Sequence, residues 1–359
     1  MHFGNVELDA AFIDAEDIVA KLHFLDQMER RWPYNPAKGV SLSERVACSL
    51  TQLPPELQQF ALAVFTNVIY LPDTLLRESW SYLASKIARD LGITVCNLFE
   101  QSHLLEVDPS GLIPTFLHEN KVHGRLDTDH FSRLQSIDEL ANNLRLIGLS
   151  DKQEEGSVHG IRLAFSRPFW LLLSDNVLSG TSVASDLSRC DRLINAYSKL
   201  GTPKIIPVTQ VLTSSAESSV LSSWTTTFAL RFDKQFQVLP GNEDCSLFSR
   251  RDTLDGAIRL CDWFASQDWF SKDDRLTATL QKSGDNMAYG YKRGGWTIVT
   301  PNCPTNSLPI LWYEREGVYK APFPRIMSRT SQMKGHGEEL TEDAISLAPR
   351  VLKKLGVVD

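Results

Sequence analysis

One short stretch, from Pro168 to Ser182, constrains the fold more than any other part of this 359-residue chain. Its sequence is PFWLLLSDNVLSGTS: an apolar run leads into Asp175, passes through a turn of small residues and opens a helix. The helix is marked by apolar residues at helical spacing, namely Val183, Leu187, Cys190, Leu193, Ile194 and Tyr197. A strand, a tight turn and a helix in that order direct free backbone N–H groups toward one point at the end of the strand.

The turn has the composition of an anion-binding loop. The first N–H groups of a helix have no partner within the helix, and the helix dipole places partial positive charge there, which suits a phosphate. Small residues let the backbone approach such a group, and hydroxyls add donors; here they are Ser179, Gly180, Thr181 and Ser182. An ordinary strand-to-helix connection with a well-formed N-terminus is the alternative.

The rest of the chain alternates between the two kinds of element. Runs rich in β-branched and aromatic residues predict strands at 102–107, 112–117, 161–165, 168–174, 204–212, 225–232 and 296–300. Helical spacing predicts helices at 15–29, 55–70, 74–91, 135–147, 181–200, 252–267, 274–282 and, divided by Pro349, 341–355. Segments 118–132 and 213–223 are expected to be surface loops. The pattern predicts an α/β protein with a mainly parallel sheet and a helical N-terminal region.

Charge and hydropathy narrow the class of partner. The net charge of −7 argues against broad binding to nucleic acid or to an anionic membrane. No apolar run reaches membrane-spanning length, and the first residues lack a basic-then-apolar signal. The six cysteines are scattered, without a CxxC pair, as expected of reduced thiols. We expect a cytoplasmic protein without a membrane partner.

The loop resembles the phosphoribosyl diphosphate (PRPP) loop of the type I phosphoribosyltransferases. In that alignment Ser174 and Asp175 take the two acidic positions, and Ser179 to Ser182 take the 5′-phosphate loop. The resemblance implies that Asp175 faces the ribose hydroxyls or their Mg²⁺. Two positions depart from the pattern. Ser174 replaces a carboxylate, and Leu178 stands where several purine-type members have an acid, so this chain lacks that proton-transfer group.

A second turn precedes the loop by about sixty residues. Val107-Asp108-Pro109-Ser110-Gly111 follows a predicted strand, the relation that the pyrophosphate turn has to the phosphate loop in those enzymes. The resemblance implies that Ser110 and Gly111 offer backbone amides to a pyrophosphate. The same residues also suit a simple turn.

Two later blocks resemble a phosphoribosyltransferase-like family found in bacterial conflict (anti-phage) gene clusters. One is a glycine- and tyrosine-rich stretch that leads to a strand and to Pro-Asn and Leu-Pro-x-Leu-Trp motifs, here residues 289–312 with Cys303-Pro304-Thr305 inserted. The other is Pro-Phe-Pro-Arg, which ends at Arg325. Asn302 is a hydrogen-bonding candidate and Arg325 a phosphate-binding one, whereas Trp312 suits either base stacking or core packing. The resemblance covers about residues 75–327.

We expect three segments: a helical region at 1–100, a phosphoribosyltransferase-like α/β domain at 101–335 and a helical tail at 336–359. The resemblance does not explain the first and last of these, which rest on the residue pattern, but it implies a function. The expected function is that of an effector in an antiviral system, such as a retron. It would bind PRPP or a nucleotide with Mg²⁺ and act at C1 of the ribose. A reverse transcriptase with its nucleic acid, or another defence protein, is the partner that this implies.

Two other functions stay open. Loss of the carboxylate at position 174 favours a degenerate domain that binds a nucleotide or phosphosugar and signals without catalysis. The long helical N-terminus favours a scaffold subunit of a defence complex.

Overall fold

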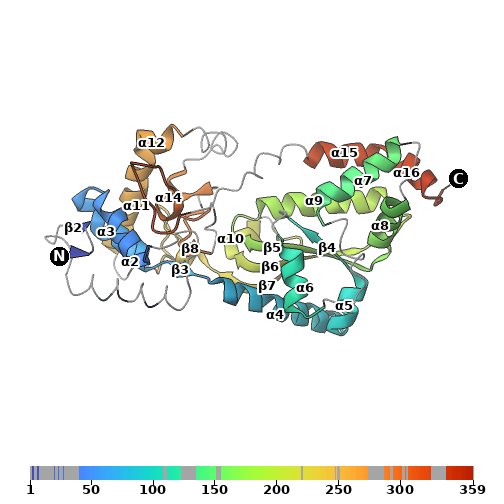
Figure 1. Ribbon diagram of the computed structural model, residues 1–359, viewed down its shortest axis with the longest axis horizontal. Helices are drawn as coiled ribbons and strands as arrows, with labels where there is room; N and C mark the ends of the chain where they lie inside the picture. The colour runs from blue at the N-terminus through green and yellow to red at the C-terminus, as the bar shows by residue number, and fades with distance from the viewer. Residues whose placement is uncertain are drawn as a thin grey trace. The chain divides into compact units, whose positions relative to one another are not determined.

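A computed structural model of the chain forms two compact units, which we describe separately (Figure 1). Unit 1 comprises Met1–Leu75 and Phe232–Met327, and unit 2 comprises Leu76–Arg231 and Ser328–Asp359. The structure describes residues 40–107, 111–122, 135–150, 155–219, 221–246, 248, 251–273, 287–291, 294–300, 304, 306–324 and 337–358, with 2–3, 6–7, 20, 23 and 27.

Unit 2 contains a four-stranded sheet in the order β4-β5-β6-β7. Its strands are β4 (Ser102–Glu106), β5 (Phe169–Val177), β6 (Lys204–Thr213) and β7 (Thr227–Phe232). The pairs β4–β5 and β5–β6 are parallel, with Leu173 opposite Glu106 and Ser174 opposite Thr209. Strands β4, β5 and β6 are largely buried because helices cover both faces of the sheet, whereas most of β7 is half-buried.

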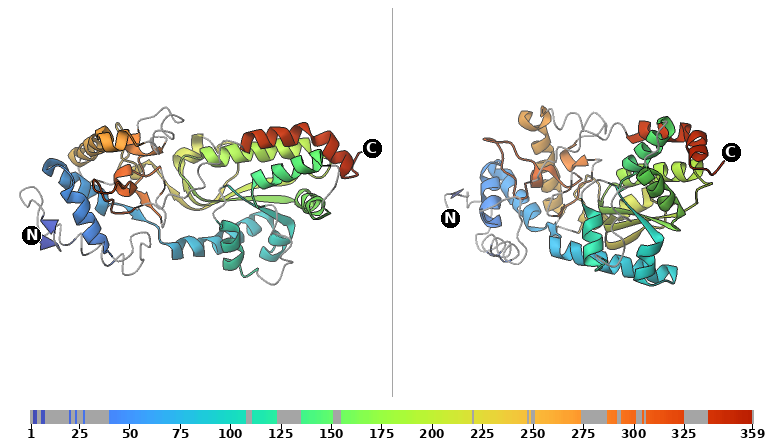
Figure 2. Two further views of the ribbon diagram at one scale, coloured as in Figure 1. Left: turned by 45° about the horizontal axis from the view of Figure 1, so that its top comes forward. Right: turned by 45° about the vertical axis from the view of Figure 1, so that its right-hand side comes forward.

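Two helical layers cover this sheet (Figure 2). Alternate residues of one strand face opposite layers, so Trp170 and Leu172 belong to one core and Leu171 and Leu173 to the other. The second of these layers contains α4 (Asp73–Leu91), α5 (Val95–Gln101) and α6 (Leu112–Glu119). The first contains α7 (Ile137–Leu149), α8 (Glu155–Ser166), α9 (Thr181–Ala196), α15 (Gly337–Ser346) and α16 (Ala348–Lys354). The short α10 (Ser214–Ser219) follows β6.

The C-terminal helices complete the core of unit 2. Leu352 of α16 and Leu355, which directly follows this helix, are buried in the same cluster as residues of α7 and α9. Arg189 of α9, almost fully buried, donates to Thr341 Oγ1 of α15 at 2.8 Å and pairs with Asp138 of α7. The ε-ammonium of Lys354 donates to Ile147 O at 2.9 Å, near the end of α7. Residues 337–354 are therefore integral to this unit.

Tyr197 gives this packing a pH-dependent contribution. The side chain is fully buried, and its hydroxyl donates to Ala344 O of α15 at 2.5 Å. Burial raises the pKa of Tyr197 above its usual value of about 10. A raised pKa in the folded state favours the protonated form. The resulting stability is complete below pH ~10 and is lost as the pH rises further.

We expect Tyr197→Phe to cost about 1 kcal/mol in the free energy of unfolding, because it removes a buried hydrogen bond. The variant should also lose less stability than the wild type between pH 9 and roughly 11, the range above the usual tyrosine pKa. Urea unfolding at these pH values measures both effects. Tyr82→Phe is the control, since Tyr82 is 52% exposed; equal behaviour of the two variants would show that Tyr197 does not contribute in this way.

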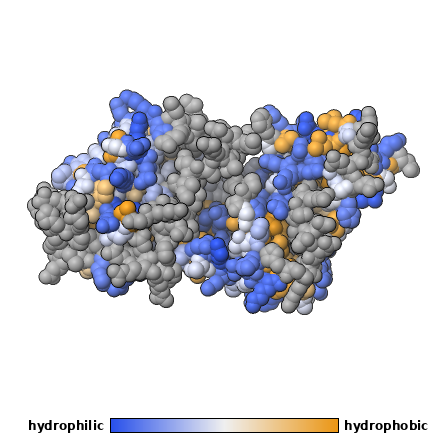
Figure 3. Space-filling model, in the orientation of Figure 1, coloured by the Kyte–Doolittle hydropathy of each residue, from blue (hydrophilic) through white to orange (hydrophobic). Residues whose placement is uncertain are grey.

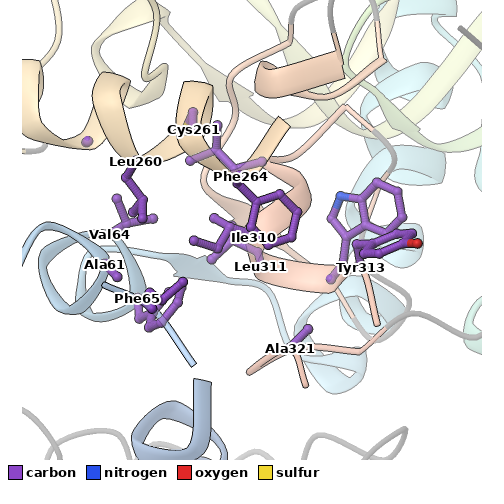
Figure 4. Close-up of a cluster of buried hydrophobic side chains, with 14 of the residues drawn as sticks. Ala61, Val64, Phe65, Leu260, Cys261, Phe264, Ile310, Leu311, Tyr313 and Ala321 are labelled. Carbon is purple, nitrogen blue, oxygen red and sulfur yellow. The ribbon is translucent and has the colours of Figure 1, made fainter. Parts of the chain in front are cut away.

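Unit 1 is organised around a largely helical core. Its elements are β1 (His2–Phe3), β2 (Val6–Glu7), α2 (Leu42–Thr51), α3 (Pro55–Thr66), β3 (Ile69–Tyr70), η3 (Lys234–Phe236), α11 (Arg251–Ser266), α12 (Asp268–Ser271), η4 (Met287–Tyr289), β8 (Ile298–Val299) and α14 (Pro309–Trp312). Strand β3 pairs in parallel with β8. Phe65 of α3, Phe264 of α11 and Leu311 of α14 lie in one buried cluster (Figure 4).

Most expected elements are confirmed, and two strands are wrong. The α/β class with a parallel sheet is as predicted, and so are β4, β5, β6, β7 and the break between α15 and α16. Segment 112–117 is helix α6, and 161–165 lies within α8. In both, the buried residues follow helical spacing: Ile113, Phe116 and Leu117 in α6, and Ile161, Ala164 and Phe165 in α8.

Smaller corrections concern the ends of elements. Helix α3 stops at Thr66, because Ile69 and Tyr70 pair with β8 instead of extending the predicted 55–70 helix. Part of the expected loop 213–223 forms α10. The predicted helix 274–282 lies outside the described residues, as do most of 15–29 and of the loop 118–132.

The two compact units cut across the expected domains. Helices α2 and α3 of the predicted N-terminal region belong to unit 1, whereas α5 belongs to unit 2. The two units are defined by contacts between residues, whereas the expected limits at 100 and 335 refer to segments of the sequence. These domain limits therefore stay predictions.

Candidate functional site

The loop between β5 and α9 presents an open helix N-terminus. Gly180 is the N-cap of α9, with φ +74°, a left-handed conformation that favours glycine. Gly180 has no side chain that could cap this end of the helix. Thr181 and Ser182, the first two helical residues, are exposed, and the hydroxyl of Thr181 donates to Ser179 Oγ at 3.4 Å. The first two residues of a sixteen-residue helix thus face solvent, where an anion site would need access, whereas Val183 is buried.

Buried contacts hold this loop in place. Leu178 is 3% exposed, and its carbonyl accepts a hydrogen bond of 2.7 Å from the hydroxyl of Thr213. Thr213 ends β6, is fully buried, and also accepts a hydrogen bond from Ala216 N at the start of α10. The loop is therefore anchored to the neighbouring strand.

Asp175 lies near the carboxyl end of β5, three residues before the turn. It is exposed, and its Oδ1 accepts a hydrogen bond of 2.6 Å from Asn176 N. Its carbonyl accepts from the Thr209 hydroxyl on β6 at 3.3 Å, which fixes the backbone. Ser174, at the other acidic position of the alignment, is 7% exposed. Asp175 is thus the only carboxylate of the predicted pair.

The second predicted turn follows the adjacent strand β4. Gly111 is the N-cap of α6 in a left-handed conformation, φ +78°. Its amide donates to Glu106 Oε2 at 3.1 Å, and the amide of Ile113 donates to Glu106 Oε1 at 2.6 Å. Glu106 is 3% exposed. A carboxylate of the chain itself therefore accepts from the amides of Gly111 and Ile113 at the end of this turn.

The two turns lie on neighbouring parallel strands of one sheet. Glu106 is paired with Leu173, two residues before Asp175. Unit 2 thus brings Gly111 to the same sheet edge as Asp175 and the residues 179–182. Ser110 lies outside the described residues.

Asn302 and Arg325 also lie outside the described residues, in sequence that belongs to unit 1. Their contacts with a ligand stay predictions. Trp312 is 3% exposed and its indole N–H donates to Ser307 O at 3.0 Å, so it packs in the core. Asn306 donates to Tyr291 O at 2.9 Å and ties the loop together.

Sequence reasoning missed Glu106 and Thr213. Glu106 ends the apolar run Leu104-Leu105 just before a turn, which is the one local signal that it caps the following helix. Thr213 gives no such signal, because its partner Leu178 is 35 residues away in the sequence.

A groove lies at the opposite end of α9. It has a volume of about 610 Å³ and is lined by Ala196, Lys199, Ala348, Pro349, Arg350, Leu352, Lys353 and Val358. The length of α9 places Ala196 about 22 Å from Thr181, so this groove is separate from the loop. Hydrophobic residues gather over α7, α15 and α16 at this end of unit 2 (Figure 3), where Leu146 and Leu149 are each 50% exposed.

Two negative findings hold for the part of the chain that the structure describes. No three His, Cys, Asp or Glu residues are grouped so as to hold a metal ion. None of its helices combines the length and the apolar character needed to cross a membrane.

Comparison with known proteins gives one match. A family model described as PRTase-CE, a phosphoribosyltransferase-like family, matches residues 50–325. No curated protein and no solved structure matches the chain.

Proposed function

Because the chain belongs to the PRTase-CE family, we propose that it binds the 5′-phosphate of a ribose-containing ligand, PRPP or a nucleotide, at the loop between β5 and α9. One observation carries this proposal. Helix α9 starts at a glycine N-cap without a side-chain cap, and its first two residues, Thr181 and Ser182, are exposed after the carboxyl end of a parallel strand, the place where α/β sheets bind ligands. In this proposal the amides at the start of α9 bind the phosphate, with the hydroxyls of Thr181 and Ser182 as additional donors.

Asp175 has the position and exposure to act on the ribose. As an exposed carboxylate before the phosphate loop, it would bind the ribose hydroxyls or a Mg²⁺ held together with ligand oxygens. A single carboxylate is sufficient for this role, because Mg²⁺ bound to a protein retains several water ligands and is also coordinated by phosphate oxygens of the ligand. The ion would supply positive charge that stabilises a departing group at C1 of the ribose.

A non-catalytic binding function is the second candidate. Ser174 and Leu178 are both buried, so neither position presents an acid or base to a ligand. A loop of this kind retains the phosphate site without a proton-transfer group, and such a domain would sense a nucleotide or phosphosugar.

The biological role is a proposal that rests on the sequence resemblance. We propose an effector of a cytoplasmic antiviral system, in which a reverse transcriptase with its nucleic acid, or another defence protein, is the partner.

Thermal denaturation with PRPP and Mg²⁺ tests the binding function. A ligand at a hundred times its dissociation constant adds about 2.7 kcal/mol, so we expect the melting temperature of unit 2 to rise by roughly 5–10 °C. Asp175→Asn should weaken the Mg²⁺-dependent binding about tenfold, or ~1.4 kcal/mol, and leave the unliganded melting temperature unchanged.

Asp191→Asn is the matched control, since Asp191 is exposed near the other end of the same helix. Consumption of PRPP would establish catalysis, and binding without consumption would establish the sensor. If neither PRPP nor any nucleotide raises the melting temperature, the binding function is wrong and the scaffold remains.

A further inference from the structure

We propose that this site takes a ribose carrying a single phosphate, as in ribose 5-phosphate or a nucleoside 5′-monophosphate, in preference to PRPP, because Glu106 accepts from the amides of Gly111 and Ile113 where the resemblance expects a pyrophosphate. The inference rests on the proposed function and narrows its ligand class.

Glu106 acts as an internal anion at the second turn. Its two carboxylate oxygens accept from Gly111 N at 3.1 Å and Ile113 N at 2.6 Å. These amides start α6, and Gly111 is one of the two residues expected to bind a pyrophosphate. The side chain is 3% exposed, so it is part of the folded turn and not a surface group that a ligand displaces easily.

The two helix starts at this sheet edge therefore differ. The start of α9 has no side-chain cap and exposes Thr181 and Ser182. The start of α6 is already neutralised by a carboxylate of the preceding strand. Among the described residues, Thr181 and Ser182 at the first helix start are exposed, whereas the amides of Gly111 and Ile113 at the second already bind a carboxylate.

A pyrophosphate at the second turn would meet two penalties. It would have to displace Glu106 from the amides, leaving a buried carboxylate without those donors. If Glu106 stayed in place, the like charges would repel each other at short range in a partly buried environment. A ligand without the pyrophosphate meets neither penalty and still has its 5′-phosphate at α9.

Calorimetric titration of the full chain with a ligand series tests this inference. The probes are ribose 5-phosphate, adenosine 5′-monophosphate and a carbocyclic PRPP analogue that cannot lose its pyrophosphate, each with Mg²⁺. We expect ribose 5-phosphate to bind more tightly than the PRPP analogue. An analogue that binds as tightly as ribose 5-phosphate, or more tightly, would overturn the inference while leaving the proposed function intact. If none of the probes binds, the proposed function itself fails.

Glu106→Gln then assigns the effect to this side chain. The amide keeps one acceptor for the turn but removes the charge. We expect affinity for the PRPP analogue to rise at least fivefold and affinity for ribose 5-phosphate to change less than twofold. Equal changes for both ligands would contradict the role of Glu106. Glu44→Gln is the matched control, because Glu44 caps α2 of unit 1 through Ser41 N. If Glu106→Gln does not fold, the ligand series on the wild type decides.

Discussion

Aspartate in place of Thr181 is expected to reduce affinity for a 5′-phosphate ligand at least thirtyfold, about 2 kcal/mol, without destabilising the protein. Thr181 is the exposed first residue of α9, where the proposed phosphate binds. A carboxylate there competes for the same amides and repels the ligand. The same charge interacts favourably with the helix dipole, which contributes roughly 0.3–1 kcal/mol to stability. Binding and stability therefore change in opposite directions.

Ser188→Asp is the control for this prediction. Ser188 is exposed on the same helix, about 10 Å further along the axis, beyond the ~8 Å Debye length at physiological salt. We expect it to leave affinity within threefold of the wild type. Calorimetry and thermal melting of both variants check the result. Equal affinities for Thr181→Asp and the wild type would show that the ligand does not bind at this helix start.

Removal of residues 337–359 is expected to abolish cooperative unfolding of unit 2. The deletion removes Val351, Leu352 and Leu355 from the core, at about 2 kcal/mol each for burial alone. It also takes Thr341 and Glu338 away from Arg189, whose side chain is 8% exposed. Since typical domains are stable by only about 5–15 kcal/mol, the shortened unit should lose its transition. Differential scanning calorimetry of the shortened chain measures this loss.

Single substitutions distinguish the loss of buried side chains from the shorter length of the chain as the cause of this effect. Leu355→Ala should cost about 2–5 kcal/mol, because Leu355 is fully buried. Lys353→Ala, at an exposed position of the same helix, should stay within about 0.5 kcal/mol of the wild type. A shortened chain that keeps both its unfolding transition and its ligand binding would contradict the integral role of α15 and α16.

Local patterns explain which parts of this fold the sequence could predict. The apolar run of β5, the small-residue turn and the helical spacing of α9 lie within thirty residues and agree with each other. The sequence predicts strands at 112–117 and 161–165 because a short apolar run fits the period of a strand as well as that of a helix. Both segments are helices that bury one face. In α6, Ile113 and Phe116 are buried against β4 and β5.

The long-range features could not be predicted in the same way. Arg189 and Thr341, whose bond joins α9 to α15, are 152 residues apart. Glu106 accepts from the amides of Gly111 and Ile113, and the Asp-Pro-Ser-Gly composition does not specify the left-handed conformation of Gly111 at this helix start. The candidate site was thus predictable where it is one local loop, whereas the state of its second turn required the structure.

The most direct test of the central claim is a backbone NMR titration of isotope-labelled protein with ribose 5-phosphate. If the 5′-phosphate binds at the start of α9, the amide resonances of Thr181, Ser182 and Val183 shift on addition of the ligand, and those of Gly111 and Ile113 stay near their original positions. Binding by calorimetry without shifts at residues 181–183 would contradict the claim that this loop is the phosphate site.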